Sequence, residues 1–180
     1  GKGFAIKYGF KCAKGDFVIF LDSDLEISCK ELCSYIEVLE YADLAIASKR
    51  HPSSKVQVPF MRRLFSCGFH ILMKLLIGLS VSDTQSGLKV CRIEALRRIF
   101  HLLTVKKFAF DVELLTVAQL LRLRVVELPV KITLGARFSI KAIFRMLIDL
   151  LGIAYRLRIK RWYQKNMNNL DADYKPIIKW

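Results

Sequence analysis

The feature that most limits how this chain folds is a continuous apolar run, DFVIFLD, at residues 16–22. A run of this length without polar alternation is typical of a β-strand that is buried on both faces. Helical patterns lie on either side of it, at residues 3–13 and 28–42, and an apolar segment at 43–49 predicts the next strand. Helices that alternate with strands at this spacing indicate an α/β fold.

The rest of the chain continues this alternation. A loop is expected at residues 50–59, which contain two prolines, and further strands are expected at 87–92 and 124–130. Helical periodicity covers residues 60–78, 93–103, 109–122 and 139–163. A chain of 180 residues suits one domain with a substantial core.

The charge of the chain is strongly positive and unevenly distributed. The sequence has 30 Lys and Arg against 16 Asp and Glu, a net charge of +14. Residues 49–82 contain six cations and no acid, and residues 137–165 contain eight cations and one acid. This balance indicates an anionic partner: a phosphorylated substrate, a nucleic acid or an acidic membrane surface. Because the cations stand among apolar residues rather than on one polar face, we expect no nucleic acid partner.

Three acids stand at alternate positions where the first apolar run ends: Asp22, Asp24 and Glu26. In an extended chain these positions point the same way, so the carboxylates repel one another unless a cation lies between them. Oxygen ligands at the carboxyl end of a strand suit Mg²⁺ or Mn²⁺, and open α/β sheets bind ligands at that end. The alternative is a solvated turn in which Ser28 caps the following helix.

Ordered segments across residues 1–160 resemble one enzyme family. The segments GKGFAIKYGFKCAKGDFVIFLDSDLEIS, ASKRHP, PFMRRLFSCG, SDTQSGLKVCR, KKFAFDVELL and VVELPVKITLGARFSIKAIFRMLIDLL are similar to those of family 2 glycosyltransferases of GT-A fold. They most resemble the dolichyl-phosphate or polyprenyl-phosphate mannose and glucose synthases, and DTQSG with FAFDVELL favours the dolichyl-phosphate glucosyltransferase branch. The resemblance implies a Rossmann-like mixed sheet flanked by helices, with amphipathic helices at a membrane interface.

The resemblance also implies a donor site built around the acids. Asp22 and Asp24 match the family's Asp-x-Asp pair, which holds a nucleotide sugar through Mg²⁺ or Mn²⁺, and Glu26 matches a further oxygen ligand. Asp24 is expected to contribute to catalysis, because the metal neutralises the departing diphosphate. Arg137 keeps a cation where the family usually has Lys in Gly-x-Ser-Lys-x-Ser, so a contact to the donor diphosphate is expected. Gln85 is expected near the sugar.

Three further residues match the family's site for the phosphate of a lipid acceptor: Arg50, Arg62 and Ser66. Arg62 and Ser66 are four apart on the predicted helix and therefore share a face, and guanidinium groups suit phosphate binding. The alternative is a solvated helix face. Asp111, at a helix start, is expected to orient the acceptor or the sugar or to act as a base. The alternative for Asp111 is an acid that simply favours a helix N-terminus.

The predicted helix at residues 139–163 has a broad apolar face and one narrow charged stripe. The stripe consists of Lys141, Arg145, Asp149, Gly152, Arg156 and Lys160. This pattern is typical of a helix that lies in a membrane interface, and residues 60–79 show a similar one. The alternative is a helix packed on the sheet or on a partner. No apolar run reaches the ~20 residues that a transmembrane helix requires.

These observations predict a membrane-associated, inverting glycosyltransferase. It would move glucose or mannose from UDP-glucose or GDP-mannose to dolichyl or polyprenyl phosphate. The expected organisation is a catalytic domain at 1–138, an amphipathic interface helix at 139–163 and a tail at 164–180. We expect it on the cytosolic face of the endoplasmic reticulum membrane in a eukaryote, or of the plasma membrane in a prokaryote. Association into a homo-oligomer stays open.

The family's usual first two strands, which hold the base and ribose of the donor, precede the point at which this sequence begins. We therefore expect either a fragment of a longer transferase or a paralogue that grips the nucleotide poorly. The alternative function is a catalytically inactive, membrane-binding or regulatory paralogue of such a transferase.

Overall fold

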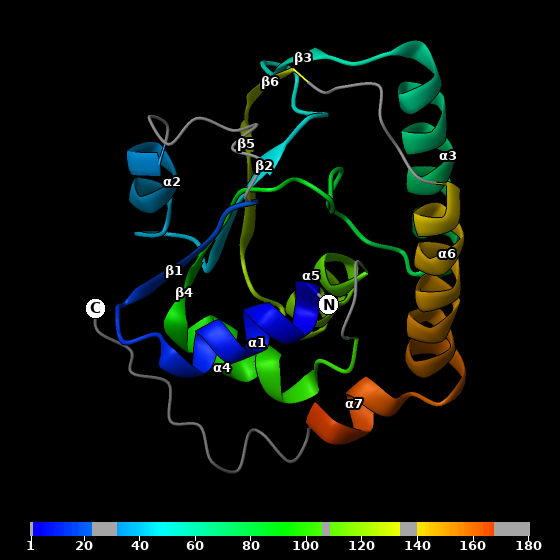
Figure 1. Ribbon diagram of the computed structural model, residues 1–180. Helices are drawn as coiled ribbons and strands as arrows, with labels where there is room; N and C mark the ends of the chain where they lie inside the picture. Colours follow the sequence, from blue (N-terminus) through cyan, green and yellow to red (C-terminus); the bar gives the residue numbers. More distant parts are fainter. Residues whose placement is uncertain (1, 23–31, 106–108, 134–139, 168–180) are drawn as a thin grey trace.

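The structure is a computed structural model that describes residues 2–22, 32–105, 109–133 and 140–167. Within these ranges the chain forms a mixed sheet with helices packed on both faces (Figure 1). The predicted α/β class, with a mixed sheet flanked by helices, is confirmed.

The main sheet has four strands, and their spatial order differs from their order in the sequence. The order across the sheet is β1 (Phe17–Phe20), β4 (Lys89–Arg92), β2 (Leu44–Ser48) and β5 (Val125–Pro129). Strand β4 runs antiparallel to both of its neighbours, whereas β2 and β5 are parallel. The carboxyl ends of β1, β2 and β5 therefore lie at the same edge of the sheet, which is where ligands bind in open α/β folds.

The helices lie close to the positions that periodicity predicts. They are α1 (Lys2–Cys12), α2 (Leu32–Val38), α3 (Phe60–Leu76), α4 (Ile93–Leu102), α5 (Phe110–Leu120), α6 (Ile140–Ala154) and α7 (Trp162–Met167). Helices α3 and α6 contact each other and stand together at one side of the molecule, away from α2 (Figure 1).

Alternate residues of the central strands divide the core into two parts. In β2, Leu44 and Ile46 join a large core that includes residues of α3, α4, α5 and α6. Ala45 and Ala47, which point to the opposite face, join a smaller core with α2. All five residues of β2 are buried, as expected for a strand covered on both faces.

The prediction that the run at residues 16–22 is buried on both faces is wrong. Val18 and Phe20 pack against the large core, but Phe17 and Ile19 are each 41% exposed. The reason is the position of β1 at the edge of the sheet, where its pairing within the described residues is with β4. The apolar run correctly predicts a strand, but it does not distinguish a central strand from an edge strand.

A second, two-stranded sheet was not predicted. Residues 50–59 were expected to be a loop, but they contain β3 (Lys55–Gln57), which pairs in parallel with β6 (Lys131–Thr133). Each strand has three residues, which is too short to give a clear alternating pattern. Because β6 follows β5 almost directly, this small sheet lies beyond the carboxyl ends of β2 and β5 (Figure 1).

The C-terminal helix is shorter and more interrupted than predicted. Helix α6 continues into a π-helical turn, η2 (Tyr155–Ile159), and the chain then bends at Arg161, which has φ of 48°. Helix α7 begins at Trp162 and packs against α4 and η2, so residues 164–167 belong to a helix rather than to a tail. The predicted boundary at residue 138 lies outside the described residues.

The charged stripe predicted on this helix is only partly at the surface. Arg156 turns inward, where it donates a hydrogen bond to the Tyr163 hydroxyl at 3.1 Å and lies 3.5 Å from a carboxylate oxygen of Glu113. Its guanidinium passes close to Gly152, where a Cβ would stand 3.4 Å from Arg156 Nη1. The helix is packed on its Leu150 side and exposed on the opposite side, so it packs on the domain along one face, and the membrane interface stays a prediction for the other.

Among the residues that the structure describes, no helix combines the length and the apolar character needed to cross a bilayer.

Candidate active site

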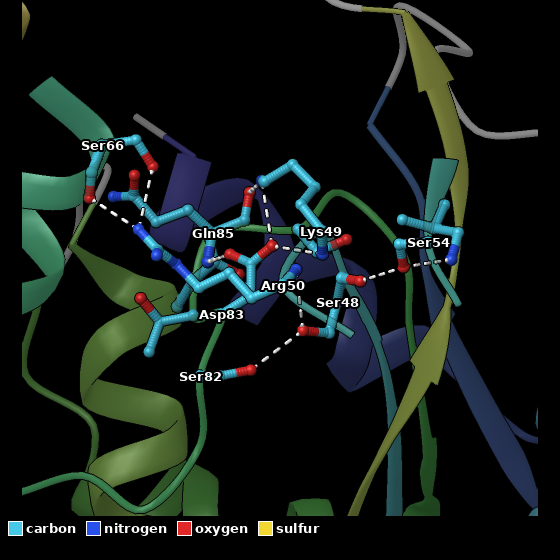
Figure 2. Close-up of polar contacts among 12 residues, drawn as sticks. Ser48, Lys49, Arg50, Ser54, Ser66, Ser82, Asp83 and Gln85 are labelled. Atoms are coloured by element: carbon cyan, nitrogen blue, oxygen red, sulfur yellow. Dashed lines mark hydrogen bonds and ion pairs between the residues drawn. The ribbon is translucent and has the colours of Figure 1, made fainter. Parts of the chain in front are cut away.

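Polar side chains gather at the carboxyl end of β2, where the chain leaves the sheet (Figure 2). The Ser48 carbonyl accepts a hydrogen bond from the Ser54 hydroxyl at 2.6 Å, and Ser54 Oγ accepts one from the Val130 amide at 2.9 Å. The Ser48 hydroxyl lies 3.1 Å from that of Ser82 and accepts a bond from the Arg50 amide at 3.3 Å. These bonds join the end of β2 to the loop before β4 and to the small sheet.

Two carboxylates organise the loop at residues 82–85. Glu127, on β5, accepts hydrogen bonds from the Ser82 amide, the Ser82 hydroxyl and the Asp83 amide at 2.7–3.1 Å. Asp83 in turn accepts bonds from the backbone amides of Lys49 at 2.9 Å and Gln85 at 3.0 Å, and its Oδ2 lies 3.2 Å from Lys49 Nζ. The loop is therefore held in one conformation by charge-assisted bonds.

The structure brings Arg50 and Ser66 together. Arg50 Nη2 donates to the Ser66 carbonyl at 3.0 Å and lies 3.5 Å from the Ser66 hydroxyl (Figure 2). The backbone of Arg62 lies one turn earlier in α3, and its side chain is outside the described part of the chain. Two of the three predicted phosphate-binding residues are thus in contact, and Arg50 remains exposed.

His70 lies one helical turn beyond Ser66, and the sequence reasoning did not single it out. Burial, followed by the positive charges of Arg50 and Lys74, lowers the pKa of its imidazole from the ordinary value, whereas Asp83 and Glu127 act in the opposite direction. The ring is therefore neutral at pH 7, when it can both donate and accept a hydrogen bond.

At the acidic end of β1, the Asp22 carboxylate lies directly against Gly87. The Asp22 amide donates to the Gly87 carbonyl at 3.2 Å. A Cβ at Gly87 would stand 2.7 Å from Asp22 Oδ2, so only glycine leaves this space to the carboxylate. Asp24 and Glu26 lie outside the described residues, and among those described no cluster of three metal-binding side chains occurs.

These observations fit a divalent cation at this end of β1. Asp22 supplies a hard oxygen donor at the carboxyl end of a strand; its backbone amide is bonded to the Gly87 carbonyl, and its carboxylate lies against Gly87. The residues predicted to hold the ion are Asp22, Asp24 and Glu26, and of these the structure describes Asp22. When bound, the ion would neutralise negative charge on a diphosphate group.

Asp111 is buried and paired. Its Oδ1 lies 2.8 Å from Lys89 Nζ, and both side chains are almost fully buried. The same Nζ donates to the Ser86 carbonyl at 2.6 Å. Asp111 is therefore not a free helix-terminal acid, and its carboxylate is fixed by a cation on the central strand β4.

The two remaining predicted donor-site residues differ in what the structure describes. Gln85 is exposed, and its side-chain amide donates to the Met146 sulfur of α6 at 2.8 Å. The loop before β4 thus reaches α6, and Figure 2 shows the Arg50–Ser66 pair beside Gln85. Arg137 lies outside the described residues.

Sequence reasoning missed Lys89 and Glu127, although both carry a recognisable signal. Each is the single charged residue within an apolar strand segment, LKVC and VVELP. A charge that is buried in a sheet requires a partner of opposite charge or several hydrogen bonds. The pattern therefore indicates a polar connection at each position, but it does not identify the partner.

The fold is an α/β sheet with a polar edge at the carboxyl ends of its strands, and comparison with known proteins identifies its family. Residues 1–100 match the sequence profile of Glycosyl transferase family 2, so the chain belongs to that family. Its predicted membership of the family, and the GT-A type of fold, are confirmed.

Two curated relatives and one solved structure illustrate the similarity. The chain is 31% identical over 177 residues to a dolichyl-phosphate beta-glucosyltransferase of Dictyostelium discoideum, covering 92% of this chain and 54% of that protein. The corresponding Drosophila melanogaster protein is 34% identical over 147 residues, covering 74% and 44%. The chain spans about half the length of these relatives.

The solved structure is glucosyl-3-phosphoglycerate synthase from Mycobacterium tuberculosis, in complex with Mn²⁺, UDP-glucose and phosphoglyceric acid. It superposes with a TM-score of 0.62 at 15% identity, covering 86% of this chain and 54% of that one. At this level of identity the similarity establishes the fold alone.

Proposed function

We propose that the protein transfers glucose from UDP-glucose to dolichyl phosphate with inversion at the anomeric carbon. The observation that carries the proposal is the contact between Arg50 and Ser66 beside the loop that holds Gln85 and, through Gly87, Asp22. The residues predicted to bind the acceptor phosphate and those predicted to bind a metal-bound diphosphate would thus act at one edge of the sheet. The named activity of the curated relatives supports the choice of glucose and dolichyl phosphate.

The chain's own residues would bind and align the two substrates. Arg50, Arg62 and Ser66 would hold the acceptor phosphate, because guanidinium and hydroxyl donors match its oxygens. Asp22, Asp24 and Glu26 would hold Mg²⁺ or Mn²⁺, and Arg137 would contact the donor diphosphate. The complex of the solved glycosyltransferase with Mn²⁺ and UDP-glucose supports this pair of ligands.

The reaction needs alignment more than it needs a strong base. A phosphate oxygen of the acceptor forms a bond to the anomeric carbon while the bond to the nucleotide diphosphate breaks on the opposite face. A phosphate monoester is already anionic at neutral pH, so no proton has to be removed from the nucleophile. Gln85 would contact the sugar, and Asp111, fixed by Lys89, would orient the acceptor or the sugar.

The test is transfer of radiolabelled sugar to dolichyl phosphate by the full chain in detergent with Mn²⁺. We expect transfer from UDP-glucose, little from GDP-mannose, and loss of transfer on chelation of the metal. Arg50→Lys keeps the positive charge but loses the guanidinium group, which can bind a phosphate through two N–H donors at once. We therefore expect the KM for dolichyl phosphate to rise about tenfold, while the KM for UDP-glucose stays unchanged.

Arg98→Lys on α4 is the matched control, since it makes the same substitution outside this site, and we expect it to leave both KM values unchanged. A wild-type chain that binds vesicles but neither binds UDP-glucose nor transfers sugar would support the alternative, a non-catalytic membrane-binding paralogue. Transfer of mannose in preference to glucose would overturn the donor assignment.

We further propose that helices α3 and α6 dock on an acidic membrane surface, on the cytosolic face of the endoplasmic reticulum in a eukaryote. The exposed apolar side chains of these helices and of η2 are here called the α3–α6 face. It consists of Phe60, Met61, Leu64, Phe65, Ile71, Leu75, Phe144, Ile148, Leu151, Tyr155 and Ile159. Exposed cations, including Arg63, Lys74 and Arg145, lie on the same helices and would attract anionic headgroups.

Vesicle flotation tests this docking. We expect the double variant Phe144→Ser with Tyr155→Ser to bind vesicles containing anionic lipid at least tenfold more weakly, because each aromatic side chain contributes about 1.5–3 kcal/mol when fully buried. The matched control is Phe4→Ser with Tyr41→Ser, two exposed aromatic residues on α1 and after α2. If both double variants bind as wild type does, the α3–α6 face is not the membrane contact.

A further inference from the structure

Lys89 is the most deeply buried cation in the described part of the chain, with a side chain that is 1% exposed. It lies on β4 between the apolar residues Leu88 and Val90. A buried ammonium group is costly unless it is paired and fully hydrogen-bonded. Two bonds compensate for this cost here: one to the Asp111 carboxylate at 2.8 Å and one to the Ser86 carbonyl at 2.6 Å.

The bond to Ser86 attaches Lys89 to the Ser86–Gly87 segment, which contacts Asp22. The carbonyl of Gly87, the next residue, accepts a hydrogen bond from the Asp22 amide at 3.2 Å. Because Gly87 has no side chain, it leaves the space that the Asp22 carboxylate occupies. The Ser86 hydroxyl is buried without a hydrogen-bond partner among the described residues. Among the described residues, the hydrogen bond from Lys89 Nζ to the Ser86 carbonyl is therefore the side-chain contact that holds Ser86.

These contacts form a continuous connection from Asp111 through Lys89 and the Ser86–Gly87 backbone to Asp22. Asp111 is on α5 and Asp22 is at the end of the edge strand β1, so the connection crosses the sheet through β4. We propose that Lys89 is a positioning residue that fixes the Asp22 carboxylate for metal binding. This inference deepens the proposed function and rests on it for the role of Asp22.

The double variant Lys89→Met with Asp111→Leu tests the proposal. Replacing both members of a buried ion pair by apolar residues of similar size usually preserves the fold, whereas removing one member leaves an unpaired buried charge. The double variant therefore removes the attachment of Ser86 without that penalty. Gly87→Ala is the companion variant, since its Cβ displaces the Asp22 carboxylate while the Lys89–Asp111 pair stays intact.

Hydrogen exchange provides a readout that does not depend on activity. In the double variant we expect the Asp22 amide to exchange at least tenfold faster, while amides of the β2–β5 ladder at residues 44–48 keep their wild-type rates. We also expect both variants to bind Mn²⁺ at least tenfold more weakly, as measured by electron paramagnetic resonance of free Mn²⁺. Unchanged exchange at Asp22 in the folded double variant would overturn the proposal.

The two readouts separate this proposal from the proposed function. If the wild-type chain transfers no sugar, the exchange rate of the Asp22 amide still decides whether Lys89 fixes that segment. If the double variant accelerates exchange at Asp22 but binds Mn²⁺ with wild-type affinity, Lys89 supports the loop and does not position a metal ligand, which also overturns the proposal.

Discussion

Replacing Asp22 or Asp24 with asparagine is expected to lower metal-dependent sugar transfer at least about 100-fold. Asparagine keeps the size of the side chain but removes the negative charge that attracts a divalent cation. Charge neutralisation by a metal contributes several kcal/mol to the transition state, and each 1.36 kcal/mol corresponds to a tenfold change in rate. The measurement is the initial rate of transfer at saturating UDP-glucose over a range of Mn²⁺ concentrations.

The chain offers a matched control for this prediction in Asp16→Asn. Asp16 and Asp22 stand at opposite ends of β1, and Asp16 is exposed. The same change in charge at the amino end of the strand is expected to leave the rate within about twofold of wild type. Transfer by Asp22→Asn that remains near the wild-type rate and still stops on chelation would remove Asp22 from the metal site.

Part of this site follows directly from the sequence. The apolar run before Asp22 predicts the strand, and the alternate spacing of the acids predicts that they lie at its carboxyl end. The helical spacing of Arg62 and Ser66 predicts one face of α3, and the structure places Arg50 against Ser66. These features are local. The two-residue period of a strand and the 3.6-residue period of a helix determine which side chains share a face, independently of the tertiary fold.

The long-range connections were not predictable in the same way. Nothing in the sequence near Lys89 identifies Asp111 as its partner, because the pairing depends on how the fold brings the start of α5 to β4. The role of Gly87 also appears only when its contact with Asp22 is known. The inward turn of Arg156 has the same origin, since Tyr163 and Glu113 come together only in the folded chain.

The buried cluster of Glu113, Tyr163 and Arg156 gives the second large expected effect, which is on stability. Glu113→Ala is expected to lower the free energy of unfolding by about 3–5 kcal/mol. Glu113 is fully buried on α5 and accepts hydrogen bonds from the amides of Thr104 and Val105 at 2.9 and 2.7 Å. It also accepts bonds from the hydroxyls of Thr104 and Tyr163, each at 2.6 Å.

Alanine at this position would leave these donors buried without an acceptor, at a cost of about 1–3 kcal/mol for each unpaired group. Burial, together with the neighbouring negative charge of Glu113, raises the pKa of the Tyr163 hydroxyl, so this group remains a proton donor at physiological pH. Because Arg156 and Tyr163 belong to η2 and α7, the loss would also weaken the attachment of the C-terminal helices to α5.

Equilibrium unfolding in urea measures this effect, with Glu94→Ala as the matched control. Glu94 is also a glutamate in the first turn of a helix, but it is exposed on α4, where such a substitution changes stability by only about 0.5 kcal/mol. Tyr163→Phe removes the bond that the hydroxyl donates to Glu113 and the bond that it accepts from Arg156, and it is expected to fall between the two, at about 1.5–3 kcal/mol. Equal stabilities of Glu113→Ala and Glu94→Ala would mean that the buried carboxylate does not hold the C-terminal helices in place.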